Sequence, residues 1–341
     1  MNILISSGIY PPDIGGPAQY ARNLYETWKS QGHNVKVAAY RWERAFPPVV
    51  RHILFFLKII RKGYKADMIL VLDTWSAAVP TMCACMLMRK KYILRTGGDA
   101  LWESYVERTG DLVLFKDFYP ATLKKLSLKE KMMFNWGGAS LRHASAIIFS
   151  TNWQKSIFEK AYSLNSAKNY VVENYYGPRM EPTQPEERVF VAAGRTLKLK
   201  NIDILRSAFT KAKIELQRRG LPDVSLDMGR AIHDGFLDKM HRAYAVILVS
   251  ISEMSPNMIA EAIQVGTPFI MTKENGITDR VGKTAVLVDP TNEADIVSKI
   301  VWLSDPKNRA SQAAAIRGFN FTHSWSDIAK EIEAVNGTAR K

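Results

Sequence analysis

Cysteine is nearly absent from this chain of 341 residues, which contains only Cys83 and Cys85. The two lie one residue apart in an apolar helical pattern from 77 to 88, and neither a histidine nor a second cysteine pair accompanies them. A disulfide framework is therefore excluded, and packing is favoured over metal binding. Reduced thiols are typical of the cytoplasm.

Long apolar runs are also missing. No segment reaches the ~18 consecutive apolar residues that a membrane-spanning helix needs. Residues 2–6 predict a short buried strand, whereas a signal peptide would need a basic start, a longer apolar segment and a small-residue cleavage site. We therefore expect a cytoplasmic protein, with a peripheral position at the inner face of the plasma membrane as an open alternative.

Short apolar segments alternate with helical patterns along the whole chain. This alternation predicts right-handed βαβ units and parallel sheets, and the 47% apolar content can supply two cores. We therefore predict an α/β fold of two doubly wound Rossmann-like domains with a ligand cleft between them. Strands are expected near 2–6, 34–39, 67–72, 91–95, 145–149, 169–173, 188–193, 224–228, 244–249, 268–271 and 285–288.

A segment rich in turn formers, residues 175–185, separates the two series of strands. Such composition is typical of a linker between domains. We predict a first domain over residues 1–175, a second domain over residues 176–318 and a terminal segment, 319–341, that contains a helix.

Two glutamates with seven residues between them stand at a predicted junction of strand and helix. The apolar run 245–249 indicates a buried parallel strand, and Pro256 suits the first turn of a helix over 257–265. Glu253 then falls at the carboxyl edge of the sheet and Glu261 one to two turns into the helix. The N–H groups and dipole of such a helix start favour a phosphate-bearing sugar, although the spacing alone also fits a solvated helix and a helix-start carboxylate.

The whole phrase resembles the donor-site signature of family-4 retaining glycosyltransferases, which have the two-domain GT-B architecture. It combines Glu-x7-Glu and an internal Pro-Asn with Gly-x-Pro at 266–268 and Glu-Asn-Gly-Ile at 274–277. The resemblance implies that Glu253 contacts hydroxyls of the donor sugar and Glu261 the ribose of the nucleotide. It also implies that backbone groups of the helix start approach the donor phosphates, at Asn257, Met258 and Ile259.

Paired glycines carry a second part of the resemblance. Gly15 and Gly16 stand between the first predicted strand and a helix that runs to Gln31. Glycine lets the backbone approach a ligand closely, and the helix start offers N–H groups to a diphosphate. A tight connection between strand and helix is the alternative. In the family, this loop belongs to the acceptor-side domain, and the terminal helix crosses back to brace it.

Two cations follow the strand at 188–193, namely Arg195 and Lys200. At the carboxyl end of a strand they would neutralise a departing nucleotide diphosphate, whereas unaided the pattern also fits a basic surface loop. In the family, Gly-Arg and a nearby lysine hold the donor phosphates, and Arg195 and Lys200 match those positions. Asn201 replaces the glycine that usually follows the lysine.

The family is generally metal-independent and uses its substrate donor without a cofactor. The chain contains no Asp-x-Asp motif that would hold a divalent ion. The resemblance therefore implies no metal and no cofactor, with Arg195, Lys200 and helix starts in the metal's place.

One position departs from the family where the reaction occurs. Members usually carry a histidine facing the reacting centre after the fourth strand, whereas the segment 93–103 offers Asp99. Asp99 would orient the acceptor hydroxyl, help accept its proton or stabilise positive charge on the sugar ring. Capping of a helix that begins near Ala100 is the equally weighted alternative.

Positive charge is concentrated in the first half of the chain. Residues 1–175 contain 24 Lys+Arg against 13 Asp+Glu, whereas residues 176–341 contain 23 and 20. The segments 48–62 and 116–134 join apolar residues to cations and suit an anionic membrane surface. A core helix with snorkelling ends is the alternative for 48–62. The membrane interpretation predicts a polyprenyl-diphosphate-linked sugar or another glycolipid as the acceptor.

Together with these patterns, the family resemblance implies a retaining glycosyltransferase that moves a sugar from a UDP- or GDP-linked donor to a hydroxyl of a glycan or lipid-linked acceptor. The predicted catalytic residues are Asp99, Arg195, Lys200 and Glu253. A nucleotide-sugar hydrolase or epimerase of the same fold is the alternative among enzymes. The net charge of +14 would also suit nucleic acid, but the sequence has no zinc-ligand set, RNA-recognition motif or basic-aromatic repeat, so no nucleic-acid partner is expected.

Overall fold

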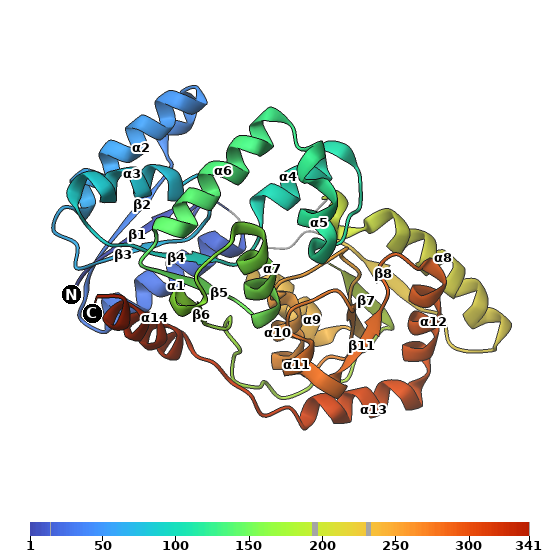
Figure 1. Cartoon of the computed structure of the whole chain (residues 1–341). Helices are drawn as coiled ribbons and strands as arrows, with labels where there is room; N and C mark the ends of the chain where they lie inside the picture. The colour runs from blue at the N-terminus through green and yellow to red at the C-terminus, as the bar shows by residue number, and fades with distance from the viewer. Residues whose placement is uncertain (14, 193–196, 230–232, 341) are drawn as a thin grey trace. The chain divides into compact units, whose positions relative to one another are not determined.

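The computed structural model describes residues 1–13, 15–192, 197–229 and 233–340. It divides into two compact units, each with its own sheet of parallel strands (Figure 1). Unit 1 comprises Met1–Ser104, Tyr119–Asn174 and Ser324–Lys341, and unit 2 comprises Tyr105–Phe118 and Tyr175–His323. The predicted α/β class with two doubly wound parallel sheets is confirmed, while the ligand cleft between the domains stays a prediction.

The sheet of unit 1 has six strands in the order β2-β1-β3-β4-β5-β6. Continuous apolar runs form most of them because helices cover both faces of the sheet. From β1 the chain continues to β2 on one side and to β3 on the other, so the strand order reverses between β1 and β3. The strands are β1 (Asn2–Ser7), β2 (Asn34–Ala39), β3 (Met68–Val71), β4 (Ile93–Thr96), β5 (Ala146–Phe149) and β6 (Asn169–Val171).

The α-helices of unit 1 connect these strands, and the last one returns to the first. The terminal helix α14 packs against α1, where the indole N–H of Trp28 donates to Glu333 (2.8 Å) and Tyr20 meets Trp325 edge to face. Short 3-10 turns supplement the helices, among them η1 (Trp42–Ala45). The helices are α1 (Gly16–Ser30), α2 (Pro48–Gly63), α3 (Ala78–Met88), α6 (Leu128–His143), α7 (Asn152–Tyr162) and α14 (Trp325–Arg340). Two further helices, α4 (Ala100–Thr109) and α5 (Phe115–Thr122), contribute residues to both units.

The sheet of unit 2 has five strands in the order β11-β10-β9-β7-β8, with the reversal between β7 and β9. Successive side chains of a strand face opposite sides of the sheet. Phe190 and Ile247 therefore pack in one buried cluster, together with Ala208 of α8 (Ile202–Arg218) and Ile300 of α12 (Glu293–Ser304). The strands are β7 (Val189–Ala192), β8 (Ser225–Asp227), β9 (Ala245–Leu248), β10 (Phe269–Thr272) and β11 (Ala285–Val288).

The opposite face of this sheet is covered by α9 and α10. Val191 and Val246 pack there with Met240 of α9 and Ile259 of α10, in a second buried cluster. Both faces are therefore closed to solvent, and ligand chemistry is confined to the loops at the strand ends. The helices are α8 (Ile202–Arg218), α9 (His233–Arg242), α10 (Asn257–Val265), α11 (Thr278–Val281), α12 (Glu293–Ser304) and α13 (Pro306–Arg317).

Within the described residues, no helix is both long and apolar enough to span a membrane. The same part of the chain contains no group of three or more His, Cys, Asp or Glu side chains placed to hold a metal ion. Cys83 and Cys85 are free thiols on α3, and burial raises the pKa of Cys85 to about 12. This buried thiol is therefore unreactive at neutral pH.

Candidate functional site

Lys200 and Glu253 meet at the point where the strand order of unit 2 reverses. Lys200 ends the 3-10 turn η4 (Lys198–Lys200) in the loop after β7, and Glu253 lies in the loop after β9. The Lys200 ammonium is 2.5 Å from Oε1 of Glu253, and the two side chains are only 17% and 14% exposed. Open α/β sheets bind ligands at such switch points, beyond the carboxyl ends of the strands.

Asn201 stands where the family usually has a glycine, and its conformation shows how an asparagine can replace that glycine. Its backbone has a left-handed conformation (φ 58°), which asparagine tolerates better than most residues with a side chain. Its buried side-chain amide donates to the carbonyls of Val249 (3.3 Å) and Pro290 (2.8 Å), which a glycine could not do. The amide of Ile251 also donates to the carbonyl of Leu199 (2.9 Å). The loops that carry Lys200 and Glu253 are thus bonded directly to each other.

The Glu-Asn-Gly-Ile run supports Glu253 from the loop after β10. The backbone N–H of Glu253 donates to the carbonyl of Glu274 (2.9 Å), and Gly276 N–H donates to the carbonyl of Glu253 (3.0 Å). Asn275 shapes this loop, since its side chain accepts from Ile277 N–H and donates to the carbonyl of Thr272, both at 2.8 Å. The position of Glu253 is therefore fixed by backbone bonds on both sides.

Helix α10 begins directly after the Glu253 loop and has the predicted bounds, Asn257–Val265. It follows Pro256 and ends at Gly266 in a left-handed conformation (φ 76°). The N-cap residue, Pro256, makes no side-chain capping bond, and the first turn of the helix carries no acidic residue. Neither of them therefore offsets the positive end of the helix dipole. Asn257 is exposed, whereas Glu261 is half-buried in the second turn.

The other predicted donor-site residues differ in how far the structure describes them. Met258 and Ile259 are buried in the first turn of α10 and pack in the core of unit 2, so only their backbone atoms suit a ligand. Arg195, the second predicted phosphate ligand, lies outside the described residues.

In unit 1, the loop after β1 adopts a conformation that requires glycine. Gly15 has φ 153° and ψ 158°, a region that is essentially confined to glycine. A Cβ atom at this position would lie 3.2 Å from Cδ1 of Ile9. Gly16 is exposed and begins helix α1.

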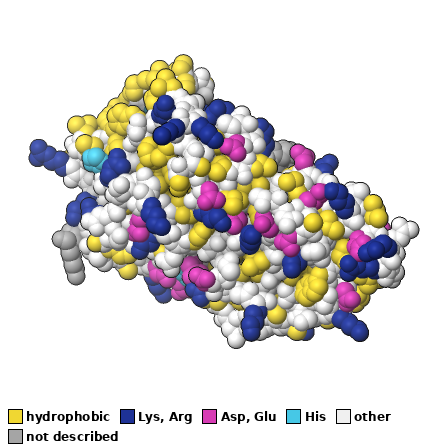
Figure 2. Space-filling view, turned by 45° about the vertical axis from the view of Figure 1, so that its right-hand side comes forward, with side chains coloured by type: hydrophobic (Ala, Val, Ile, Leu, Met, Phe, Trp, Pro, Cys, Tyr) yellow, Lys and Arg dark blue, Asp and Glu magenta, His cyan; other side chains and the backbone are white. Residues whose placement is uncertain are grey.

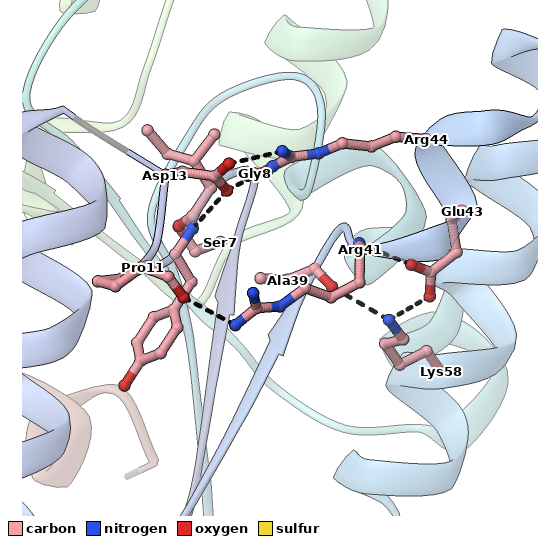
Figure 3. A network of polar contacts seen from close by, with 11 residues as sticks. Ser7, Gly8, Pro11, Asp13, Ala39, Arg41, Glu43, Arg44 and Lys58 are labelled. Atoms are coloured by element: carbon pink, nitrogen blue, oxygen red, sulfur yellow. Dashed lines mark hydrogen bonds and ion pairs between the residues drawn. The ribbon is translucent and has the colours of Figure 1, made fainter.

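Asp13 anchors this glycine loop to the segment that follows β2 (Figure 3). Its two carboxylate oxygens accept from the guanidinium of Arg44 at 2.7 and 2.6 Å, and Arg41 donates to the carbonyl of Pro11 (2.8 Å). The bonds from Arg44 are the main cause that lowers the pKa of Asp13 to about 2. The glycine pair predicts this loop from the sequence, but no sequence pattern predicts its two arginine partners, which lie about thirty positions away.

The same segment is tied onward to helix α2 (Figure 3). The carboxylate of Glu43 is completely buried, accepts from the backbone N–H of Arg41 (2.8 Å) and forms an ion pair with Lys58 of α2. Lys58 also donates to the carbonyl of Ala39 (3.0 Å). A continuous set of polar contacts therefore joins the glycine loop to α2.

Asp99 caps helix α4 with one oxygen and binds a tyrosine with the other. Oδ1 accepts from the N–H groups of Leu101 (2.9 Å) and Trp102 (3.1 Å), and Oδ2 accepts from the hydroxyl of Tyr119. Asp99 is only 2% exposed, and this burial raises its pKa. The bonds match the capping alternative.

An exposed apolar surface covers α2, α3 and α6 of unit 1. On α2 only Phe55, Ile59 and Gly63 are buried, so the alternative of a core helix for 48–62 does not fit. Figure 2 shows hydrophobic side chains gathered at the top of the molecule, where α2 lies in Figure 1. We call this surface the apolar face; its exposed residues are Val49, Val50, Ile53, Leu57, Met86, Leu87, Leu128, Met132 and Trp136.

The structure divides the second predicted membrane segment, 116–134. Lys116 belongs to unit 2 and forms a 2.7 Å ion pair with Glu274, whereas residues 119–134 belong to unit 1. Lys124, Lys125, Lys129 and Lys131 are exposed there, near Leu128 and Met132 of the apolar face. Lys116 therefore belongs to a different unit from the lysines with which it was grouped in the sequence.

Comparison with solved structures identifies the fold. Solved structures match nearly the whole chain: sucrose-phosphate synthase from Thermosynechococcus elongatus has a TM-score of 0.70 at 15% identity, covering 99% of this chain and 98% of that one. HepE from Anabaena, in complex with UDP and glucose, has a TM-score of 0.69 at 15% identity, covering 99% of each chain. WaaG, a glycosyltransferase involved in lipopolysaccharide biosynthesis, has a TM-score of 0.65 at 12% identity, covering 98% and 99%. The fold is thus the GT-B fold of glycosyltransferases.

Residues 187–305 match the family model described as glycosyl transferases group 1. None of the curated proteins matches the chain. The matched segment contains Lys200 and both glutamates of the Glu-x7-Glu pair, so the family signal and the candidate site coincide. Residues 187–305 are therefore similar to group 1 glycosyltransferases, within a chain that has the GT-B fold.

Proposed function

We propose that this protein is a glycosyltransferase that transfers a sugar from a UDP- or GDP-linked donor to a hydroxyl of a glycan or lipid-linked acceptor, with retention at the anomeric carbon. The observation that carries the proposal is the Lys200–Glu253 ion pair at the switch point of unit 2, inside the family match. A cation and a carboxylate held together suit a donor that carries both phosphates and sugar hydroxyls.

In this proposal, unit 2 binds the donor. Lys200 neutralises the diphosphate as it departs, together with Arg195, which lies outside the described residues. The start of α10, which has no acidic residue in its first turn, offers the diphosphate the positive end of a helix dipole. Glu253 accepts hydrogen bonds from sugar hydroxyls, and Glu261 binds the ribose. UDP is favoured as the nucleotide because HepE was solved with UDP and glucose.

The bond changes constrain where the acceptor's proton goes. The bond from the anomeric carbon to the diphosphate breaks with its electron pair on the diphosphate, and the acceptor oxygen bonds to the same carbon. Retention by a single displacement brings the acceptor to the face from which the diphosphate leaves. We therefore propose that the departing phosphate oxygen takes the proton, without a metal or cofactor.

For Asp99 we propose a positioning role in place of direct catalysis. Both of its carboxylate oxygens already accept hydrogen bonds, from the start of α4 and from Tyr119. An aspartate that is 2% exposed also reaches a substrate poorly. This supports the capping alternative and leaves proton transfer to the donor itself.

The proposed acceptor is linked to a lipid at the cytoplasmic face of the membrane. The apolar face of unit 1 supports this, because Val49, Ile53 and Leu57 of α2 are 71%, 54% and 52% exposed and would insert among lipids. The exposed lysines at 124–131 would meet anionic headgroups. A polyprenyl-diphosphate-linked sugar combines both chemistries.

A donor screen tests the proposal. Thermal shifts with UDP- and GDP-sugars, with and without EDTA, should identify one stabilising donor, and Glu253→Gln and Lys200→Ala should each reduce its shift. NMR of the product should show an unchanged anomeric configuration. Inversion, dependence on a divalent ion, or undiminished shifts in both variants would contradict it. Rapid release of free sugar without an acceptor would favour the hydrolase alternative.

A further inference from the structure

Residues 105–118 come from the first half of the chain but belong to unit 2. We call this segment the clasp. It is anchored by Phe115 and Phe118, both completely buried, and the ring of Phe118 lies 5.4 Å from that of Tyr105. The buried rings therefore hold the clasp in the protein interior, and several of its polar groups bond to the loops of the candidate site.

One end of the clasp holds the loop of Lys200. The carbonyl of Glu107 accepts from the ammonium of Lys198 (3.0 Å), and its carboxylate accepts from the backbone N–H of Leu199 (3.4 Å). Both partners immediately precede Lys200 in the turn η4. The clasp thus contacts the neighbours of Lys200 in the loop after β7.

The other end of the clasp holds the loops of Glu253. The backbone N–H of Phe115 donates to the hydroxyl of Ser252 (3.0 Å), the residue before Glu253. Lys116 pairs at 2.7 Å with Glu274, whose carbonyl accepts from the N–H of Glu253. The side chain of Glu274 is 7% exposed, whereas that of Lys116 is 45% exposed. A carboxylate so deeply buried depends on its cation, and Lys116 supplies one from the surface.

We propose that Lys116 is a positioning residue for sugar transfer: through Glu274 it fixes the loop of Glu253, while Glu107 fixes the loop of Lys200. The inference rests on the proposed function of that pair. Displacing a catalytic group by about 1 Å can cost about 10²-fold in rate, so the clasp acts on the rate of the transfer step more than on donor binding.

The test compares single and double variants at saturating donor and acceptor. Lys116→Ala should lower kcat by about 10- to 100-fold with the donor KM changed less than about threefold, and Lys116→Arg should recover most of the rate. Lys116→Ala combined with Glu274→Gln should be no slower than Lys116→Ala, because Lys116 acts through the charge of Glu274. The double variant also removes the buried charge of Glu274, which Lys116→Ala leaves without its cation. Its kcat can therefore be measured even if Lys116→Ala folds poorly.

Lys273→Ala is the matched control. Lys273 is adjacent to Glu274 but pairs with Asp289 at 2.9 Å and is 50% exposed, so its loss should leave kcat unchanged. Lys200→Ala, measured in parallel, reports on the proposed function itself. Lost transfer in Lys200→Ala with wild-type kcat in Lys116→Ala would overturn the clasp alone. A wild-type protein that transfers no sugar would overturn both, and equal losses in Lys273→Ala and Lys116→Ala would also overturn the positioning role.

Discussion

Lys200 and Glu253 are 53 positions apart in the chain, yet their side chains form a 2.5 Å ion pair. The pair is produced by topology, since the strands that precede it, β7 and β9, are neighbours on either side of the strand reversal. A diphosphate at this position would compete with Glu253 for Lys200 and leave the carboxylate to sugar hydroxyls. The ion pair thereby keeps both groups ordered before the donor arrives.

The first prediction concerns this pair. Lys200→Ala should lower kcat by about 10²- to 10³-fold, the usual cost of losing one group that stabilises developing negative charge. Glu253→Gln should weaken donor binding more than it slows transfer. The glutamine amide has the shape of the Glu253 carboxylate but lacks the negative charge with which it accepts hydrogen bonds from sugar hydroxyls. Initial rates over a range of donor concentrations separate the two effects. Lys211→Ala, which removes an exposed pair with Glu293, is the control and should behave as the wild type.

The second prediction concerns the glycine loop. Gly15→Ala forces a side chain into a glycine-only conformation, a strain of about 1–3 kcal/mol, and brings its Cβ within 3.2 Å of Ile9. The loop should shift, and kcat/KM should fall by about tenfold or more. Gly32→Ala is matched, since Gly32 also has a positive φ (82°) but open space around it, at the opposite end of the sheet. Equal kinetic losses in both variants would show that general destabilisation, and not the loop, is responsible.

Much of unit 2's site could be predicted because its signals are local. A short apolar run, Pro256 and Gly266 define β9 and α10, and parallel strands bring their carboxyl ends to one edge. Asn201 was visible as a departure from the family pattern. Its explanation, a left-handed backbone with two side-chain bonds, depends on Val249 and Pro290, which no local pattern connects to it.

The clasp could not be predicted, because its contacts also join residues that are far apart in the sequence. Lys116 and Glu274 are 158 positions apart, and Lys116 stands at the start of a basic stretch whose composition favoured a membrane surface. The composition of a segment is a local property, whereas the ion-pair partner of a single lysine depends on the tertiary fold. Similarly, the sequence around Asp99 suits capping and catalysis equally, and its bond to Tyr119 has no local signal.

The third prediction uses the raised pKa of Asp99. A carboxyl whose pKa is raised by burial binds its proton more tightly in the native state than in the unfolded state. Its contribution to stability is complete below the unfolded pKa of about 3.9 and is lost as pH rises through the folded pKa. Asp99→Asn keeps an oxygen for the N–H groups of Leu101 and Trp102 but removes the titration. Relative to the wild type, its melting temperature should therefore be more favourable at pH 7 than at pH 4.

A variant with the opposite sign controls for this pH dependence. Bonds from Thr291 and Lys273 lower the pKa of Asp289 to about 2, so its contribution is present above the unfolded pKa and lost as pH falls toward 2. The deficit of Asp289→Asn should thus shrink only below about pH 4. A difference between Asp99→Asn and the wild type that stays constant from pH 4 to pH 8 would contradict the role of burial at Asp99.

The fourth prediction concerns the apolar face and a membrane. Ile53 and Leu57 are one turn apart on α2 and more than half exposed, so both would insert together into the boundary of a bilayer. Burying each such side chain contributes about 1.5–3 kcal/mol, and the double variant Ile53→Asp with Leu57→Asp should lower affinity for anionic vesicles by about 10²-fold or more. Vesicle flotation at rising salt concentration separates the electrostatic contribution of the lysines from the apolar contribution of Ile53 and Leu57, because salt screens the lysines but does not weaken apolar insertion.

Ile214→Asp is the control variant. Ile214 lies on α8 of unit 2 and is 64% exposed in the wild type, so this variant should float as the wild type does. Equal flotation of all three proteins would place the contact elsewhere, and a wild type that does not bind vesicles would remove the argument for a lipid-linked acceptor.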